Sequence, residues 1–178
     1  AGHSKARVLT PARAGKLLGT GAAGGKRRTT VTIRGRLQKV RTYATKMWSL
    51  RKSGANTRLM TRTAATSAMM YGADVQGISD SMLKQQTSTI ARLLAREGSG
   101  KNPLKTLYAI DGARGTTDPA FDANALLIKH WAMAWWEDWV PQSALSEAFL
   151  HTTTKMSNGK AKWNQVTGPA AALYLTLR

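Results

Sequence analysis

The apolar residues of this chain recur in steps of three and four, and no segment shows sustained alternation with a period of two. Steps of three and four place side chains along one face of an α-helix, whereas alternation is typical of a half-buried strand. Hydrophobic residues make up 42% of the 178 positions, which is enough to form a core. We therefore predict an all-α fold, an irregular helical domain over residues 34–178 that follows a flexible basic arm over residues 1–33.

Glycine, proline and polar caps bound the predicted helices. Gly54 is a C-terminal cap for the first helix, and Gly72 and Gly77 interrupt the chain after the second. Ser79 is an N-cap for the third helix, and Pro141 stops the long helix that begins near residue 121. The predicted helices cover residues 34–53, 56–70, 80–97, 104–111, 121–139, 142–150 and 167–177.

Residues 120–178 form a Trp-rich helical tail in this prediction, and one face of its first helix is expected to point into the core. Exposed tryptophans can stack on nucleic-acid bases. We favour a core or partner-facing role, because rings at helical spacing bury much apolar area. Trp136 lies off the main stripe, and Glu137 and Asp138 beside it argue against phosphate contact there. The expected inward face is Phe121, Ala125, Ile128, Ala132, Trp135 and Trp139, and the candidate partner-interface residues are Trp131, Trp135, Trp136 and Trp139.

The basic side chains are concentrated in the first part of the chain. Residues 1–73 contain 16 Lys and Arg residues and no carboxylate, whereas residues 74–178 contain 11 basic and 9 acidic residues. A field of one sign attracts phosphate backbones through the release of counterions. A solvated surface, an acidic protein partner and an anionic membrane surface are the alternatives. We expect the phosphate backbone of RNA or DNA to be the partner.

The sequence "GTGAAGGKRRTT" predicts a flexible hinge in the arm, because its glycines leave the backbone free. It does not fit a phosphate-binding P-loop, which needs Gly-x4-Gly-Lys-Ser/Thr. Thr20 stands in place of the first glycine, and Arg27 stands in place of the hydroxyl residue. The arm and the first helix then supply the candidate nucleic-acid-binding residues, which are Lys26, Arg27, Arg28, Arg34, Arg36, Lys39, Arg41 and Lys46.

The stretch "YGADV" contains a single carboxylate, Asp74, and no acidic residue lies upstream of it. Polymerases that copy RNA into DNA need paired carboxylates on a tight turn, which hold two metal ions about 4 Å apart. That site is absent from this sequence, and we expect Asp74 to cap a helix or to pair with an arginine. The three histidines lack metal-ligand spacing and there is no cysteine, so we predict no metal site, no cofactor and no enzyme.

Three consecutive segments read "RGRLQKVRTYATKMWSLRK", "TAATSAMMYGADVQGIS" and "DSMLKQQTSTIARLLA". This order resembles the thumb region of non-LTR retrotransposon reverse transcriptases, where a basic helix precedes a small-residue helix ending in Tyr-Gly-Ala-Asp/Glu-Val and then a Leu-bearing helix. The segment before them, "LLGTGAAGGKRRT", resembles the Leu-Gly-x5-Gly stretch followed by basic residues that precedes this region in those proteins. The segment after them, "DGARGTTDPAFDANALLIKHWAMAWWEDW", resembles the tail of reverse-transcriptase-like proteins, so the resemblance covers about residues 17–150. It implies that residues 34–97 are thumb-like helices that hold a template–primer duplex, with the catalytic palm on a longer precursor or lost.

Two functions of different classes follow from these observations. The first is a non-catalytic nucleic-acid-binding segment, and the second is a structural subunit of a ribonucleoprotein or an organellar membrane complex, held by its basic arm. The sequence contains no run of about 18 uncharged apolar residues, so it predicts no transmembrane helix. We expect an intracellular location, and the sequence leaves the nucleus and an organelle open. The last predicted helix has no stop signal, which suggests a piece of a longer or processed protein.

Overall fold

The computed structural model describes residues 14–17, 20–23, 28–95, 101–111, 117–157 and 162–178. Every element from Val31 onward in these ranges is helical, which confirms the predicted all-α class. A short antiparallel hairpin, in which Ala14 pairs with Ala23, lies within the predicted arm and was not expected from the glycine-rich sequence. The elements are β1 (Ala14–Leu17), β2 (Thr20–Ala23), α1 (Val31–Arg41), α2 (Ala44–Lys52), α3 (Thr57–Met60), η1 (Thr61–Thr66), α4 (Ser67–Met70), α5 (Ala73–Gln76), α6 (Asp80–Leu94), α7 (Pro103–Asp111), α8 (Pro119–Trp136), α9 (Gln142–Met156), η3 (Trp163–Gln165) and α10 (Pro169–Leu177).

The first predicted helix is two helices in the structure, because the chain turns between α1 and α2. At the turn the Thr42 hydroxyl donates to the Lys39 carbonyl oxygen at 2.7 Å, and the Tyr43 amide donates to the Val40 carbonyl oxygen at 3.0 Å. These short-range bonds compete with the bonds of a continuous helix. α2 then ends before Gly54, as predicted, and Gly54 takes the left-handed conformation with φ of 85°.

The second predicted helix corresponds to α3, η1 and α4 in unbroken succession, with a π-helical turn in the middle. It ends at Tyr71, as predicted, because Gly72 takes φ of 81° and turns the chain into α5. Gly77 has φ of 62° and closes α5 before α6 begins. The two glycines thus supply the left-handed conformations that other residues rarely adopt.

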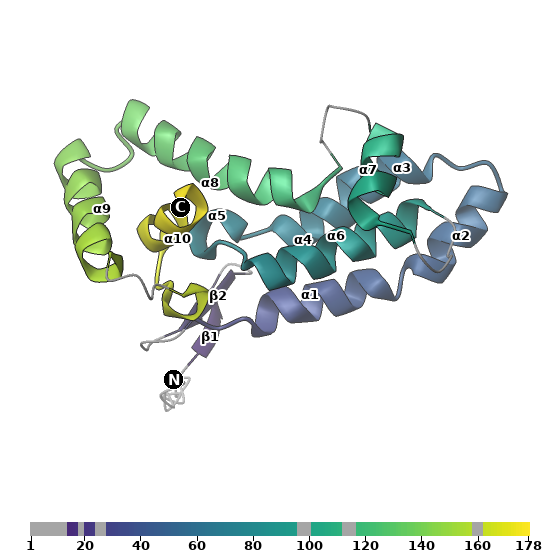
Figure 1. The fold of residues 1–178 in the computed structure, drawn as a ribbon, viewed down its shortest axis with the longest axis horizontal. Helices are drawn as coiled ribbons and strands as arrows, with labels where there is room; N and C mark the ends of the chain where they lie inside the picture. Colours follow the sequence, from purple (N-terminus) through teal and green to yellow (C-terminus); the bar gives the residue numbers. More distant parts are fainter. Residues whose placement is uncertain (1–13, 18–19, 24–27, 96–100, 112–116, 158–161) are drawn as a thin grey trace, which may run out of the picture.

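Two apolar clusters hold the helices together. The larger cluster centres on α6, which packs against α1, η1 and α7 and buries Ile90, Leu93 and Leu94. The smaller cluster joins the second half of α8 to α9 and α10 through Leu127 and Met156. α8 runs along one edge of the molecule and contributes to both clusters (Figure 1). One side of α8 is therefore packed along its length, while its other side faces away from the body.

The prediction for the buried face of the long tail helix was wrong. Phe121 is 53% exposed, Ile128 45% and Trp135 39%, although all three were expected to face the core. The opposite face of α8, with Ala123 and Leu127, is the buried one. Both faces of this helix carry apolar residues, so periodicity alone did not determine which of them packs inward.

The ends of three further helices also differ from the prediction. α6 ends at Leu94 instead of residue 97, and α8 ends at Trp136 instead of residue 139. α9 continues to Met156, past the predicted end at residue 150. In this last part of α9 the hydroxyls of Thr153 and Thr154 donate to carbonyl oxygens four residues earlier, at 2.9 and 3.0 Å, so both are satisfied within the helix.

Candidate nucleic-acid interface

α1 separates its apolar and its basic residues by helical spacing. Ile33, Leu37 and Val40 are buried against the core. Arg34 and Arg41, which are seven residues apart and therefore on one side of the helix, flank this apolar face next to α6. The apolar stripe thus fixes the orientation of α1, and that orientation places both arginines beside α6.

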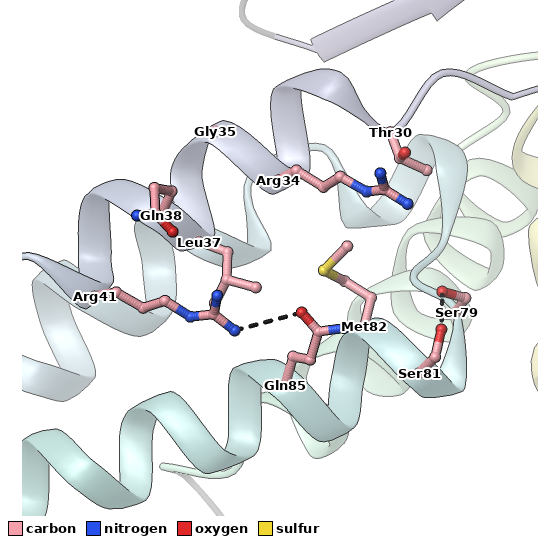
Figure 2. Close-up of a pocket in the computed structure, with 10 residues that line it drawn as sticks. All are labelled: Thr30, Arg34, Gly35, Leu37, Gln38, Arg41, Ser79, Ser81, Met82 and Gln85. Atoms are coloured by element: carbon pink, nitrogen blue, oxygen red, sulfur yellow. Dashed lines mark hydrogen bonds between the residues drawn. The ribbon is translucent and has the colours of Figure 1, made fainter.

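A groove of about 540 Å³ lies between α1 and the first half of α6 (Figure 2). Leu37 and Met82 are buried residues of its lining, and Arg34 and Arg41 reach from α1 toward α6 on either side of Met82. None of its described lining residues is acidic. We call it the cationic groove, and its lining residues are Thr30, Arg34, Gly35, Leu37, Gln38, Arg41, Ser79, Ser81, Met82 and Gln85.

Neutral side chains of α6 hold Arg41 in position. Its Nη2 donates to Gln85 Oε1 at 3.4 Å, and its Nε donates to Thr89 Oγ1 at 3.5 Å. The Thr89 hydroxyl donates in turn to the backbone carbonyl oxygen of Gln85 at 2.8 Å. A guanidinium group has five N–H donors, so these two long hydrogen bonds orient Arg41 and leave donors for an anion. Both acceptors are neutral, and the positive charge is retained.

The N-terminus of α6 opens into the same groove. Ser79 occupies the predicted N-cap position, but its hydroxyl does not cap the helix and lies 3.3 Å from the Ser81 hydroxyl. Both serines line the groove, and the positive end of a helix dipole favours an anion there. Asp80, which lies between them in sequence, is exposed and lowers the positive potential. Sequence analysis missed Ser81 and Gln85, whose spacing of four residues was the available signal.

The structure separates the other predicted phosphate contacts. Lys39 and Lys46 are exposed on α1 and α2. Arg36 points away from the cationic groove: its guanidinium lies 5.0 Å from the centroid of the Tyr71 ring, and its Nη1 donates to the Tyr71 carbonyl oxygen. The remaining two candidates of the arm, Lys26 and Arg27, lie outside the described residues.

Arg28, a predicted phosphate contact, makes contacts within the protein in the structure. Its Nη1 donates to the carbonyl oxygens of Gln76 and Gly77, each at 2.9 Å. Its guanidinium lies 5.5 Å from the centroid of the Trp163 ring. Burial lowers the pKa of Arg28 from its ordinary value. Because these contacts hold the guanidinium inside, Arg28 joins the start of α1 to the end of α5 and to η3.

One ion pair and one histidine–carboxylate contact join described residues, and neither of them lies in the cationic groove. Arg58 pairs with Asp111 at 2.6 Å, and the second oxygen of Asp111 accepts from the Thr117 amide at 2.8 Å. Asp74 lies in the first turn of α5 and pairs with His130 on α8 at 2.9 Å. Asp74 was predicted to cap a helix or to pair with an arginine, whereas Gly72 is the N-cap of α5 and the partner of Asp74 is His130. One arginine of the basic half therefore has a carboxylate partner among the described residues.

A second cavity, of about 600 Å³, lies beside α8 and is lined by residues including Asp74, Asp122 and His130. Burial raises the pKa of Asp122, an effect that Arg62 opposes and Asp118 reinforces. Within the described part of the chain, no group of three or more His, Asp or Glu residues is arranged to hold a metal ion. The cavity therefore carries carboxylates that repel phosphate, in contrast to the cationic groove.

The four tryptophans of the tail lie in different environments. Trp131 is half-buried, with its ring centroid 6.0 Å from that of Phe149. Trp135, Trp136 and Trp139 are exposed, and Trp136 is the most exposed of them at 87%. One of the four thus packs in the core, while three lie on the surface at the end of α8.

Comparison of the chain with protein-family models, with curated proteins and with solved structures gave no match. The similarity to reverse-transcriptase thumbs therefore stays a prediction from the sequence. Among the helices that the structure describes, none combines the length and the apolar character that crossing a bilayer requires.

Proposed function

We propose that this chain binds the phosphate backbone of RNA or DNA through the cationic groove and does not itself catalyse a reaction. The observation that carries the proposal is the pair Arg34 and Arg41, which border a buried apolar floor with no acidic residue in its described lining. Neutral partners on α6 orient Arg41 there. Guanidinium groups suit this role because their planar N–H donors match phosphate oxygens in pairs.

The spacing of the two arginines fits a nucleic-acid strand. Seven residues of α-helix rise about 10 Å, so Arg34 and Arg41 can contact two different phosphates of one backbone. Lys39 and Lys46 add positive charge on the exposed sides of α1 and α2. Contacts of this kind position a backbone and carry no base information, so we expect little sequence preference.

The thumb of a reverse transcriptase offers one setting for this binding. A thumb holds a template–primer duplex, while metal-bound carboxylates elsewhere perform the transfer reaction. In this proposal the chain supplies the holding surface alone. We expect it to show no primer extension with Mg²⁺ or Mn²⁺, and extension that disappears in Asp74→Ala would contradict this expectation.

The salt dependence of binding tests the proposal. With about 5–7 phosphate contacts, log K should fall against log salt with a slope of roughly −4 to −6 on duplex. The double variant Arg34→Gln/Arg41→Gln should flatten that slope by about 2, because two contacts are lost. A matched control, Lys105→Gln/Lys155→Gln, removes the same charge from exposed positions on α7 and α9. We expect the control to retain most of the slope.

Equal losses in both double variants would mean that net charge alone drives binding, and the cationic groove would have no special role. Absence of binding to RNA and DNA at low salt would reject the proposal. Acidic proteins also give a salt slope, so competition with heparin and with an acidic protein completes the measurement.

A second candidate function is that of a structural subunit in a large assembly. The observation that favours it is the exposed apolar face of α8, with Phe121, Ile128 and Trp135. Apolar patches of this kind mark interaction surfaces on soluble proteins. The two functions are compatible, because the cationic groove and this face involve different helices.

A further inference from the structure

The outward face of α8 carries a regular apolar stripe. We call it the outer stripe, and it consists of residues spaced alternately by four and three positions. A helix with this 3.5-residue period presents a nearly straight seam, the pattern by which two helices pack together. The 18 residues of α8 extend about 27 Å, so the seam has the length of several helical turns. Its residues are Phe121, Ala125, Ile128, Ala132 and Trp135.

The large side chains of the outer stripe are exposed among the described residues. α8 lies along one edge, with the remaining described helices on one side of it (Figure 1). Phe121, Ile128 and Trp135 keep 53%, 45% and 39% of their surface exposed. Ala125 and Ala132 separate these large side chains, so the stripe alternates between ridges and hollows that suit the side chains of a second helix.

The segment that carries the outer stripe has a formal charge opposite in sign to that of the whole chain. Residues 119–138, which cover α8 and the two positions after it, contain three carboxylates and one lysine, in a protein with a formal net charge of +18. Glu137 and Asp138 follow directly after α8, between the exposed rings of Trp136 and Trp139. The Trp139 Nε1–H donates to Glu137 Oε2 at 2.8 Å, which holds a carboxylate beside an indole. A lysine or arginine from a partner can contact both a carboxylate and an indole face at this end.

These observations lead to one occupant. We infer that the outer stripe binds an amphipathic helix of a different protein, whose apolar seam is flanked by Lys and Arg residues. The apolar seam of α8 is complementary to the apolar seam of a partner helix. The carboxylates near it favour positive charge on the residues that flank the partner's seam. This interface goes beyond the phosphate binding proposed above and does not depend on it.

A second copy of this chain is a poorer occupant. In an antiparallel pair centred on Ile128, Glu137 and Asp138 of one copy would lie against the Asp118 and Asp122 end of the other. In a parallel pair, Glu137 and Asp138 would lie against the same residues of the second copy. Carboxylates face carboxylates in both arrangements, which disfavours self-association.

Two designed helical peptides test the inference with the full chain. Both have three heptads with leucine at the seam positions, and their flanking positions are lysine in one and glutamate in the other. Binding is measured by fluorescence anisotropy of the labelled peptides in about 0.15 M salt, where the screening length is about 8 Å and local charges dominate. The net charge of +18 would favour the glutamate peptide. We expect the opposite, with the lysine peptide binding about tenfold more tightly.

Two sets of variants locate the binding surface. Ile128→Ser and Trp135→Ser should each weaken the lysine peptide by about tenfold or more while the circular dichroism spectrum stays unchanged, since both residues face outward. Glu137→Gln/Asp138→Asn should remove most of the preference for the lysine peptide. The matched control Asp80→Asn/Glu147→Gln removes two exposed carboxylates from other helices and should retain the preference.

Four results would overturn the inference. They are absence of binding by either peptide, equal or tighter binding of the glutamate peptide, unchanged binding by Ile128→Ser, and a concentration-dependent dimer in sedimentation that Ile128→Ser abolishes. The last result would assign the outer stripe to a second copy. Phosphate-backbone binding is measured separately on RNA, so failure here leaves the result for the cationic groove unaffected.

Discussion

α1 and α8 both lie at the edge of the molecule, but they present different chemistry to solvent (Figure 1). α1 buries Leu37 and Val40 and exposes Arg34 and Arg41. α8 buries Leu127 on its inner face and exposes large apolar side chains on its outer one. The polar face of α1 follows the ordinary rule for a surface helix. The outer face of α8 breaks that rule, and this departure indicates an interaction surface of another kind.

In the two proposals above, charge and exposed apolar surface serve different functions in one small domain. The carboxylates of the chain gather near α8, where they would repel phosphate, and the cationic groove contains none among its described lining residues. A phosphate backbone and a basic helix can therefore bind without competing for one surface. Each prediction below alters one of these two regions or the contacts that join them.

The largest effect is expected at Gly77, which follows α5 and packs against Trp163 of η3 and Ala172 of α10. A Cβ atom there would lie 2.5 Å from a Trp163 ring atom and 3.0 Å from the Ala172 Cβ, and φ is 62°. Gly77→Val should therefore lower the free energy of unfolding by about 3 kcal/mol or more, from steric overlap and backbone strain together. Urea unfolding measures the loss.

Gly35→Ala is the control for Gly77→Val, because nothing lies within 4 Å of a Cβ added on this side of α1. Alanine in a helix interior should raise stability by roughly 0.5–1 kcal/mol relative to glycine. Equal stability of Gly77→Val and the natural chain would show that α5 and α10 are not packed as described.

The second prediction compares the buried face of α1 directly with the exposed face of α8. Leu37→Ala should lower the free energy of unfolding by about 2–5 kcal/mol, since Leu37 is 3% exposed and its removal leaves a cavity. Ile128→Ala should change it by less than about 0.5 kcal/mol, because Ile128 is at the surface. A large loss for Ile128→Ala, measured by the same unfolding experiment, would place the outer stripe in the core after all.

Sequence patterns predicted the helical class and several boundaries because these depend on neighbouring residues. Gly54 and Gly72 end their helices through left-handed conformations that their own identity favours. The buried face of α8 could not be predicted, because the choice between two apolar faces depends on which helices pack nearby. The burial of Arg28 likewise depends on Trp163, which is far from it in sequence.

The same limit applied to the candidate site. The basic character of α1 was evident from Arg34 and Arg41 in sequence, and both residues lie in the cationic groove. The second wall of the groove comes from Ser81 and Gln85 on α6, which sequence spacing alone does not bring next to α1. The sequence therefore predicted the source of the charge, and the tertiary contacts supplied the groove around it.

The third prediction separates a structural arginine from a surface lysine. Arg28→Ala should lower the free energy of unfolding by about 1–3 kcal/mol, because the carbonyl oxygens of Gln76 and Gly77 lose their donor. It should leave the salt slope of RNA binding nearly unchanged in the folded protein. Lys39→Ala should do the reverse, with little effect on stability and a slope flatter by about 0.9. A flatter slope in Arg28→Ala would restore Arg28 as a phosphate contact.

The smallest effect concerns the one carboxylate of α8 whose pKa is clearly shifted. Burial raises the pKa of Asp122 above its ordinary value of 3.8, despite the opposing charge of Arg62. The folded chain then holds this proton to higher pH than the unfolded chain does. The contribution of Asp122 to stability is therefore most favourable below pH 3.8 and declines as the pH rises through the raised pKa.

Asp122→Asn should remove this decline, because asparagine does not titrate. At pH 7 the variant should be more stable than the natural chain by less than about 0.5 kcal/mol, since solvent screens a side chain that is only partly buried. Urea unfolding at pH 4 and pH 7 measures the difference, which should shrink toward zero at the lower pH. Burial also disfavours the charge of Arg28, which precedes α1. Arg28 adds no dependence of stability on pH between pH 4 and pH 7, because an arginine stays protonated throughout this range. A variant that is less stable at pH 7 would show that ionised Asp122 makes a favourable contact. The cost of burying the charged Asp122 side chain would then be smaller than described.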